Sequence, residues 1–212
     1  MADSLNVHYL SRKIHSLTGL IPVGAFLLFH LWENSQSRLG EQHFNEHVGG
    51  GIERLLNYKL IVEIGLLGAI LFHGIYGLVI WWQGKSNVTR YQYGANWRYV
   101  LQRITAFTTF AFIVWHVLTT RIAAGADETI ASNLFVHMQG IYDDPVNVVL
   151  YMIGIVGATF HLANGFWLLG INWGITTGVR AQRISAWACA GVFAIAAALG
   201  LHALWGFHHS FF

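Results

Sequence analysis

Four histidines stand where ionisable side chains are rare. His30, His73, His116 and His161 each lie alone in the apolar part of a different hydrophobic segment. An imidazole without a hydrogen-bonding partner in such a segment costs free energy, so ionisable residues there are candidates for a functional site. Any one of them could be a core histidine bonded to a backbone carbonyl. Four of them, one per segment, indicate a shared function.

The positions of the histidines along their segments sort them into two pairs. His30 and His116 lie eight and five residues before the arginines that follow their segments, so both are about 8–12 Å below one membrane face. His73 and His161, on segments that run the opposite way, are about 21–24 Å below the same face. Two imidazoles facing each other at equal depth are the axial ligands of a six-coordinate haem, an arrangement that favours electron transfer. We therefore predict two non-covalent haem b sites, one per pair.

The segments that carry these histidines are long enough to cross a bilayer. The chain has 212 residues, of which 55% are hydrophobic and 10% charged, whereas a soluble domain is about 25% charged. A span needs about 20 apolar residues, and five such stretches occur, at about 16–37, 59–82, 101–121, 146–171 and 184–206. We predict an all-α integral membrane protein with a single domain over 1–212. The first four helices form the haem-binding bundle, and the fifth packs alongside.

The distribution of basic residues predicts the orientation of the chain. Eight lysines and arginines flank one side of the spans and four the other: Arg12, Lys13, Lys85, Arg90, Arg98, Arg103, Arg180 and Arg183 against Arg38, Arg54, Lys59 and Arg121. By the positive-inside rule the N-terminus is cytoplasmic. The first outer connection contains GEQHFNEHVGGG (40–51), which we expect to include a short surface helix.

The composition also excludes several kinds of site. Cys189 is the one cysteine and no C-x-x-C-H motif occurs, so the chain cannot ligate an iron–sulfur cluster or attach haem covalently. A net charge of +2 gives no support for nucleic-acid binding. Two alternatives stay open for the four intramembrane histidines. One is the haem b subunit of a respiratory dehydrogenase of the hydrogenase or formate dehydrogenase type, and the other is a histidine-based ion transporter. A transporter would normally show carboxylate or sulfur ligands beside the midplane histidines.

Haem propionates need cationic or hydroxyl partners at the membrane edge. Candidates for the inner haem are Arg12, His15, Ser16, Arg103, Arg180 and Arg183. Positive-inside anchoring explains the same cations without any haem. Small residues flank two of the histidines at helical spacing and could clear a stripe for a flat macrocycle or form ordinary helix contacts: Gly157 and Gly165 beside His161, and Gly65, Ala69 and Gly77 beside His73.

Five blocks of the sequence resemble a known family. HSLTGLIPVGAFLLFHLWEN, LFHGIYG, WRYVLQRITAFTTFAFIVWHVLTTRI, FHLANGFW and NWGITTGVRAQRIS resemble the five-helix cytochrome b membrane anchor of bacterial succinate:quinone oxidoreductases, of the Bacillus-like dihaem type. The family's ligand pattern falls on His30 with His116 for the outer haem iron and on His73 with His161 for the inner one. Some dihaem fumarate reductases have a glutamate two residues before the helix IV ligand; here that residue is Thr159.

The resemblance implies a respiratory function. The chain would pass electrons from an iron–sulfur subunit, docked with a flavoprotein subunit on the cytoplasmic face, through two b haems to a quinone, with menaquinone expected. It would lie in the bacterial cytoplasmic membrane as part of the enzyme, and it has no dicarboxylate-oxidising site of its own. Whether succinate is oxidised or fumarate reduced, and whether complexes form a higher oligomer, stays open.

A quinone pocket should offer a carboxylate or a water path, because reducing a quinone takes up two protons. Glu63 is the first candidate and Glu33 the second, with a further inner site near Ser16 and Arg103. Both carboxylates are explained equally well as surface residues at the membrane interface.

Overall fold

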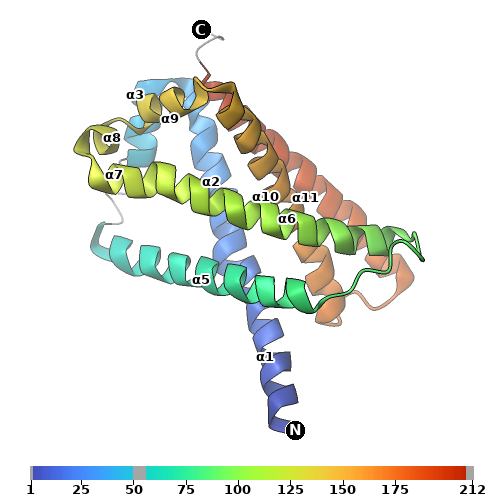
Figure 1. Cartoon of the computed structure of the whole chain (residues 1–212). Coiled ribbons are helices and arrows are strands. Elements are labelled where there is room, and N and C mark those ends of the chain that lie inside the picture. The colour runs from blue at the N-terminus through green and yellow to red at the C-terminus, as the bar shows by residue number, and fades with distance from the viewer. Residues whose placement is uncertain (1, 50–55, 209–212) are drawn as a thin grey trace.

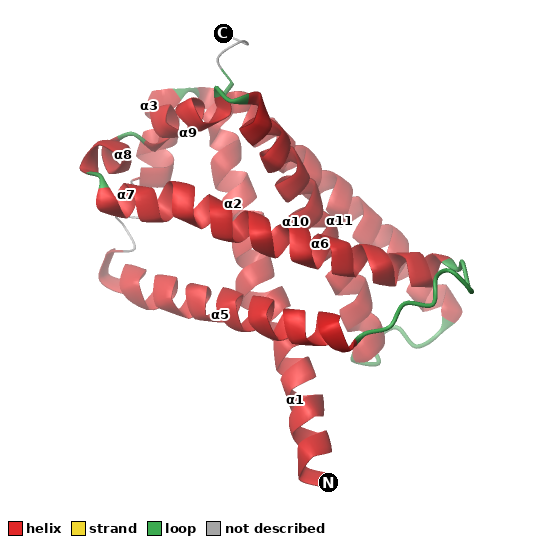
Figure 2. Cartoon of the chain, in the orientation of Figure 1, coloured by secondary structure: helices red, strands yellow, loops and turns green. Residues whose placement is uncertain are grey.

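The computed structural model describes residues 2–49 and 56–208, and its regular elements there are all helical (Figures 1 and 2). Five helices are long and apolar enough to cross a membrane: Val7–Leu39, Glu63–Gln83, Gly94–Ala126, Pro145–Asn172 and Val179–Gly206. The predicted fold class is confirmed. Arg54, counted above among the outer cations, lies outside the described residues.

Each span is built from one long helix or from helical pieces joined end to end. The first consists of α1 (Ala2–Thr18), the π-helical turn η1 (Gly19–Gly24) and α2 (Ala25–Ser35). The second is α5 (Leu56–Gln83). The third runs from α6 (Gly94–Val117) through η4 (Leu118–Ile122) into α7 (Ala123–Ala126). The last two are α10 (Pro145–Asn172) and α11 (Val179–Gly206).

The first helix begins much earlier than the sequence suggested. Its apolar run starts near residue 16, whereas α1 is helical from Ala2. Hydropathy locates the part of a helix that can lie in lipid and does not register a polar extension beyond it. In Figure 1 this extension projects from the bundle, with the N-terminus well away from the other labelled helices.

A proline explains the π-helical turn η1 in the first span. Pro22 lies inside η1, and proline has no N–H to donate to the carbonyl one turn before it. The backbone relaxes into π-helical hydrogen bonding there, which is common at functional positions. The turn brings two glycines against neighbouring helices: Gly19 against the ring of His73, and Gly24 against the side chain of Leu162.

The helix α10 is at the centre of the bundle and packs closely against both α6 and α11, whereas α2 packs against α11. A methyl group added at Gly200 of α11 would come within 3.0 Å of Leu31 and 2.6 Å of Ile155, so the absence of a side chain permits this crossing. The helix α5 packs mainly against α1 and η1. It is the least buried of the five spans, with 0% of its apolar window buried against 39% for α10.

Short helices cap one end of the bundle: η2 (Gln36–Leu39), α3 (Glu41–Phe44), η3 (Asn45–Gly49), α8 (Glu128–Ser132) and α9 (Leu134–Tyr142). The expected surface helix in 40–51 is thus present as α3 and η3. Phe44, Phe135, Tyr142 and Phe207 form the buried aromatic centre of this outer cap. An Asn45–Asn133 hydrogen bond of 2.9 Å joins its two loops.

Candidate functional site

The structure brings the four intramembrane histidines together in two pairs. The ring centres of His30 (α2) and His116 (α6) are 5.9 Å apart with the ring planes at 69°. Those of His73 (α5) and His161 (α10) are 6.1 Å apart at 83°. Two imidazoles on opposite sides of one metal ion, each with a metal–nitrogen bond of about 2 Å, have ring centres about 6 Å apart. Both pairs therefore have the separation that a bis-histidine metal centre requires.

The two pairs lie at different depths in the bundle. Tyr151, which contacts the ring of His116, precedes His161 by ten residues on α10, or about 15 Å at the helical rise. The outer pair is next to the cap, because Tyr142 of α9 packs on Tyr151 with ring centres 4.7 Å apart. The inner pair lies toward the end where the Lys13 ammonium donates to the Asn172 carbonyl at 2.6 Å.

Backbone carbonyls orient both rings of the inner pair. His73 Nδ1 lies 2.9 Å from the carbonyl oxygen of His15, and His161 Nδ1 lies 3.2 Å from that of Gln102. A carbonyl oxygen only accepts, so each Nδ1 carries the proton and donates it. Each Nε2 is then unprotonated, which is the form that binds a metal, and that of His161 lies 3.4 Å from the Gln102 amide nitrogen.

The ring of His73 is also held by packing. His15 stacks on it with ring centres 4.1 Å apart and planes 5° from parallel. Gly19 lies directly against the ring, and a side chain there would overlap it. Gly77 leaves room for His15, whose Nε2 would be 3.2 Å from a methyl group added at that glycine.

The outer pair is oriented by side chains. His116 Nδ1 is 3.0 Å from the Tyr151 hydroxyl, and Phe112 stacks on the His116 ring at 5.6 Å between centres. The Asn34 amide donates to the His30 carbonyl at 2.8 Å and lies 3.3 Å from His30 Nδ1. Burial together with the neighbouring Tyr151 raises the pKa of the Tyr142 phenol well above its ordinary value, so the hydroxyl beneath the cap stays neutral.

Two comparisons with known proteins bear on this arrangement. Residues 83–201 match the sequence model of the Succinate dehydrogenase/Fumarate reductase transmembrane subunit. The chain is 35% identical over 202 residues to the "Succinate dehydrogenase cytochrome b558 subunit" of Bacillus subtilis (strain 168), across 95% of this chain and 98% of that protein. The chain belongs to this family. No solved structure matches it.

The resemblance noted in the sequence is thereby confirmed. The chain is a membrane-integral anchor subunit of the succinate:quinone oxidoreductase enzyme, and its five apolar helices are the part that lies in the membrane. Family membership favours neither the hydrogenase-type subunit nor the ion transporter that the sequence had left open.

The predicted propionate partners of the transmembrane subunit are spread over its inner end. His15 contacts His73, as described. Within residues 2–49 and 56–208, no hydrogen bond, ion pair or ring contact joins the other five to the paired histidines. Arg12 donates to Gln83 at 3.0 Å, Ser16 is half-buried on α1, and Arg180 and Arg183 are exposed at the start of α11.

Arg103 has neighbours that the sequence did not indicate. Its guanidinium donates to the Tyr99 hydroxyl, lies 5.7 Å from the centre of the Trp81 ring and packs where Gly84 has no side chain. The inner site suggested near Ser16 and Arg103 has no contact between these two residues within the described chain.

The two carboxylates differ in their surroundings. Glu63 forms an ion pair with Arg121, whose Nη2 is 3.0 Å from Oε2 and whose Nε is 3.2 Å from Oε1. Glu33 is half-buried on α2, and no hydrogen bond or ion pair to another described residue occupies it. Thr159, at the position of the fumarate reductase glutamate, is 1% exposed and donates to the Ile155 carbonyl at 2.7 Å.

The glycines beside His161 face α6. A methyl group at Gly157 or Gly165 would be 3.5 Å from Thr109 Oγ1 or 3.8 Å from Gln102 Nε2, which is ordinary contact distance. One at Gly65 would meet nothing within 4 Å. A methyl group at Gly19, on the first span, would instead overlap the ring of His73, and the spacing around the histidines did not single this glycine out.

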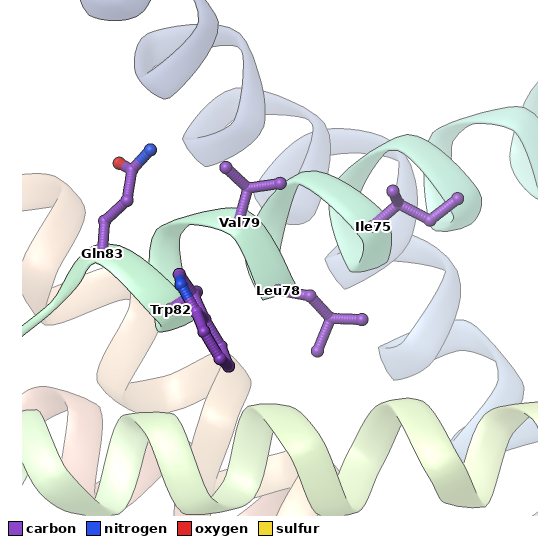
Figure 3. Close-up of a pocket in the computed structure, with 5 residues that line it drawn as sticks. All are labelled: Ile75, Leu78, Val79, Trp82 and Gln83. Atoms are coloured by element: carbon purple, nitrogen blue, oxygen red, sulfur yellow. The ribbon is translucent and has the colours of Figure 1, made fainter.

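Hollows on the bundle surface offer no alternative site. One lies on α5 and is lined by Ile75, Leu78, Val79, Trp82 and Gln83 (Figure 3). Its lining is almost wholly apolar, with the Gln83 amide at its end, as expected of a surface that meets lipid chains.

A second hollow lies between α6 and α10. Thr105 and Thr108 are its polar lining residues, and both hydroxyls donate to carbonyls of their own helix, at 2.7 Å and 2.9 Å. The two threonine hydroxyls of this hollow are thus already hydrogen-bonded within α6.

Sequence reasoning missed Gln102, Asn164 and Tyr151, which are polar residues inside apolar spans. That polarity was visible in the sequence. Their partners on other helices were not.

Proposed function

We propose that this membrane anchor binds two haem b groups, one between His30 and His116 and one between His73 and His161, and that it connects the dehydrogenase to quinone. Haem supplies one-electron redox chemistry when bound. The cytochrome name of the Bacillus subtilis relative supports a haem of b type. The number of groups is supported by the two separate ring pairs.

The observation that carries the proposal is the hydrogen bonding at Nδ1 of three of the four rings. His73 and His161 donate Nδ1–H to backbone carbonyls, and His116 has a tyrosine hydroxyl at its Nδ1. An imidazole that ligates a metal almost always donates its other ring N–H in this way, which fixes the ring and makes the bound nitrogen more basic. Both pairs thus have the separation of bis-histidine ligation, and the inner pair also has its outer hydrogen bonds.

The basic end of the bundle is the proposed docking face for the partner subunits. Arg12 and Lys13 lie at the inner ends of α5 and α10, and Arg180 and Arg183 are exposed close by in the chain that follows α10. The positive-inside rule places this end in the cytoplasm of a bacterial inner membrane. Family membership supports a flavoprotein and an iron–sulfur subunit as partners, and we assign them to this face. The whole chain, 1–212, acts as one domain.

Glu33 is the better candidate to exchange protons with a quinone. It is three residues from His30 on α2, so both side chains lie on the same face of the helix. Its carboxylate is half-buried and unpaired within the described chain, whereas Arg121 holds that of Glu63. A quinone near the outer pair would be reached from this carboxylate, and we expect menaquinone.

Haem content and quinone content test the proposal in the purified complex. We expect two b haems per chain in a reduced-minus-oxidised spectrum, and one after His73→Ala or His161→Ala. His30→Ala or His116→Ala should remove the other component. His202→Ala, an exposed histidine of α11, is the matched control and should keep both. Retention of both haems in all four ligand variants would refute the assignment, and solvent extraction identifies the quinone.

A further inference from the structure

Two amide side chains, Gln102 of α6 and Asn164 of α10, form a hydrogen-bonded network with His161 of α10. The Asn164 amide nitrogen donates to Gln102 Oε1 at 2.9 Å, and Gln102 Nε2 donates to the His161 carbonyl at 3.2 Å. Asn164 is 3% exposed. Inside a membrane helix bundle such polar side chains are expensive unless they are paired, so their placement calls for a reason.

Arg98 fixes which atom of each amide donates a hydrogen bond and which atom accepts one. Its Nη1 lies 3.4 Å from Asn164 Oδ1, and a guanidinium can only donate. Asn164 must therefore present its oxygen to Arg98 and its NH₂ group to Gln102. Gln102 then accepts through Oε1 and directs its own NH₂ group at His161. The orientations of both amides follow from the one charged donor at the end of the chain.

The spacing along the two helices explains why these residues meet. Arg98 and Gln102 are four residues apart on α6, and His161 and Asn164 are three apart on α10, so each pair occupies one face of its helix. The two faces oppose each other. Arg98 is further held over the Trp167 ring, with its guanidinium carbon 4.8 Å from the ring centre.

Gln102 therefore contacts His161 twice. Its backbone carbonyl accepts the Nδ1 proton, and its side chain binds the His161 carbonyl and lies 3.4 Å from Nε2. The first contact sets which nitrogen is protonated. The second ties the position of the histidine backbone on α10 to α6.

We propose that Gln102 and Asn164 are positioning residues for His161, and that they set the reduction potential of the inner haem. This inference rests on the proposed function, in which His161 binds iron. Hydrogen bonding at Nδ1 raises the basicity of the bound nitrogen and favours ferric iron. Loss of the network lets the ring turn away from the Gln102 carbonyl, so the potential rises.

The experiment uses the purified complex with Gln102→Met and Asn164→Leu, which replace amides by apolar side chains of similar size. We expect both to keep two haems, so folding is not at issue. The inner haem should show an altered low-spin EPR signal and at least a tenfold shift of its reduction equilibrium toward ferrous iron, or 59 mV for one electron. The outer haem should not change.

Thr108→Val is the matched control on α6, because its hydroxyl donates to the Ile104 carbonyl of its own helix and not to Gln102. It should leave both potentials where they are. In the double variant Gln102→Met/Asn164→Leu the shift should equal the larger single shift, since both residues act through one connection.

Unchanged potential and EPR signal in both single variants would overturn the inference. Additive shifts of the reduction potential in the double variant would show that Gln102 and Asn164 act independently and not through one connection. If His161→Ala retained both haems, the proposed function itself would fail, and this outcome is distinct from a normal inner haem in Gln102→Met.

Discussion

Gly19→Ala should weaken the proposed inner haem site although it only adds one methyl group on another helix. In the structure that methyl group overlaps the ring of His73. The ring has little room to yield, because its Nδ1 donates to the His15 carbonyl at 2.9 Å and its face stacks on His15 at 4.1 Å. Either the ring swings away from both partners or the first helix moves away from α5.

The size of the effect follows from three contributions. Overpacking costs about 1–3 kcal/mol, and loss of the hydrogen bond adds about 1 kcal/mol. Alanine is favoured over glycine in a helix by up to about 1 kcal/mol, which acts in the opposite direction. If the net loss of about 1–3 kcal/mol falls entirely on haem binding, the affinity of the inner site for haem falls about 5- to 150-fold.

A haem-scavenging apoprotein measures this affinity directly. The complex is equilibrated with increasing scavenger, and the two b components are followed in the reduced-minus-oxidised spectrum. We expect the inner component to transfer first in Gly19→Ala and the outer one to behave as in the unmodified complex. Gly68→Ala is the control, since a methyl group there meets nothing within 4 Å.

The outcome that contradicts the reasoning is also defined. Inner haem that Gly19→Ala holds as tightly as the unmodified complex would show that Gly19 does not touch His73. Equal loss in Gly68→Ala would trace the effect to a general change in the helices.

Three further predictions follow from particular contacts. Tyr151→Phe removes the hydrogen-bond partner of His116 Nδ1, which should cost about 1–3 kcal/mol and alter the EPR signal of the proposed outer haem alone. Glu63→Gln and Arg121→Gln should each change thermal stability by at most about 1 kcal/mol, because the pair is half-exposed, and a double-mutant cycle checks this. The Tyr142 pKa is raised, so its contribution to stability is full below the unfolded value of about 10 and is lost as pH rises above it. Alkaline melting of the complex should therefore be delayed in Tyr142→Phe.

The sequence predicted the five spans well because the bilayer imposes a length and a composition on them. It placed the start of the first span at about residue 16, and the helix that contains this span extends back to Ala2. The polar residues in between have no apolar pattern to mark them, and a helix outside lipid needs none.

The sequence also indicated which histidine faces which, for a simple geometric reason. Helices are straight rods with a rise of 1.5 Å per residue, and successive spans alternate in direction, so a residue count is a depth. The same count says nothing about rotation around each helix. That is why Tyr151 and Gln102 went unnoticed, and why Glu63 was not matched with Arg121, 58 residues away.

The two sites differ in what holds their rings, and this has a consequence for the subunit. At the inner site both Nδ1 protons go to backbone carbonyls of neighbouring helices, those of His15 and Gln102. No substitution can remove a carbonyl, so ring orientation there depends on where α1 and α6 lie as well as on the side chains that pack around the rings. At the outer site the partners are the Tyr151 hydroxyl and the Asn34 amide, which single substitutions delete. If a partner docks on the inner end, as proposed, and contacts these helices, it can therefore reach the inner histidines through the backbone, while the outer histidines respond to local side-chain chemistry.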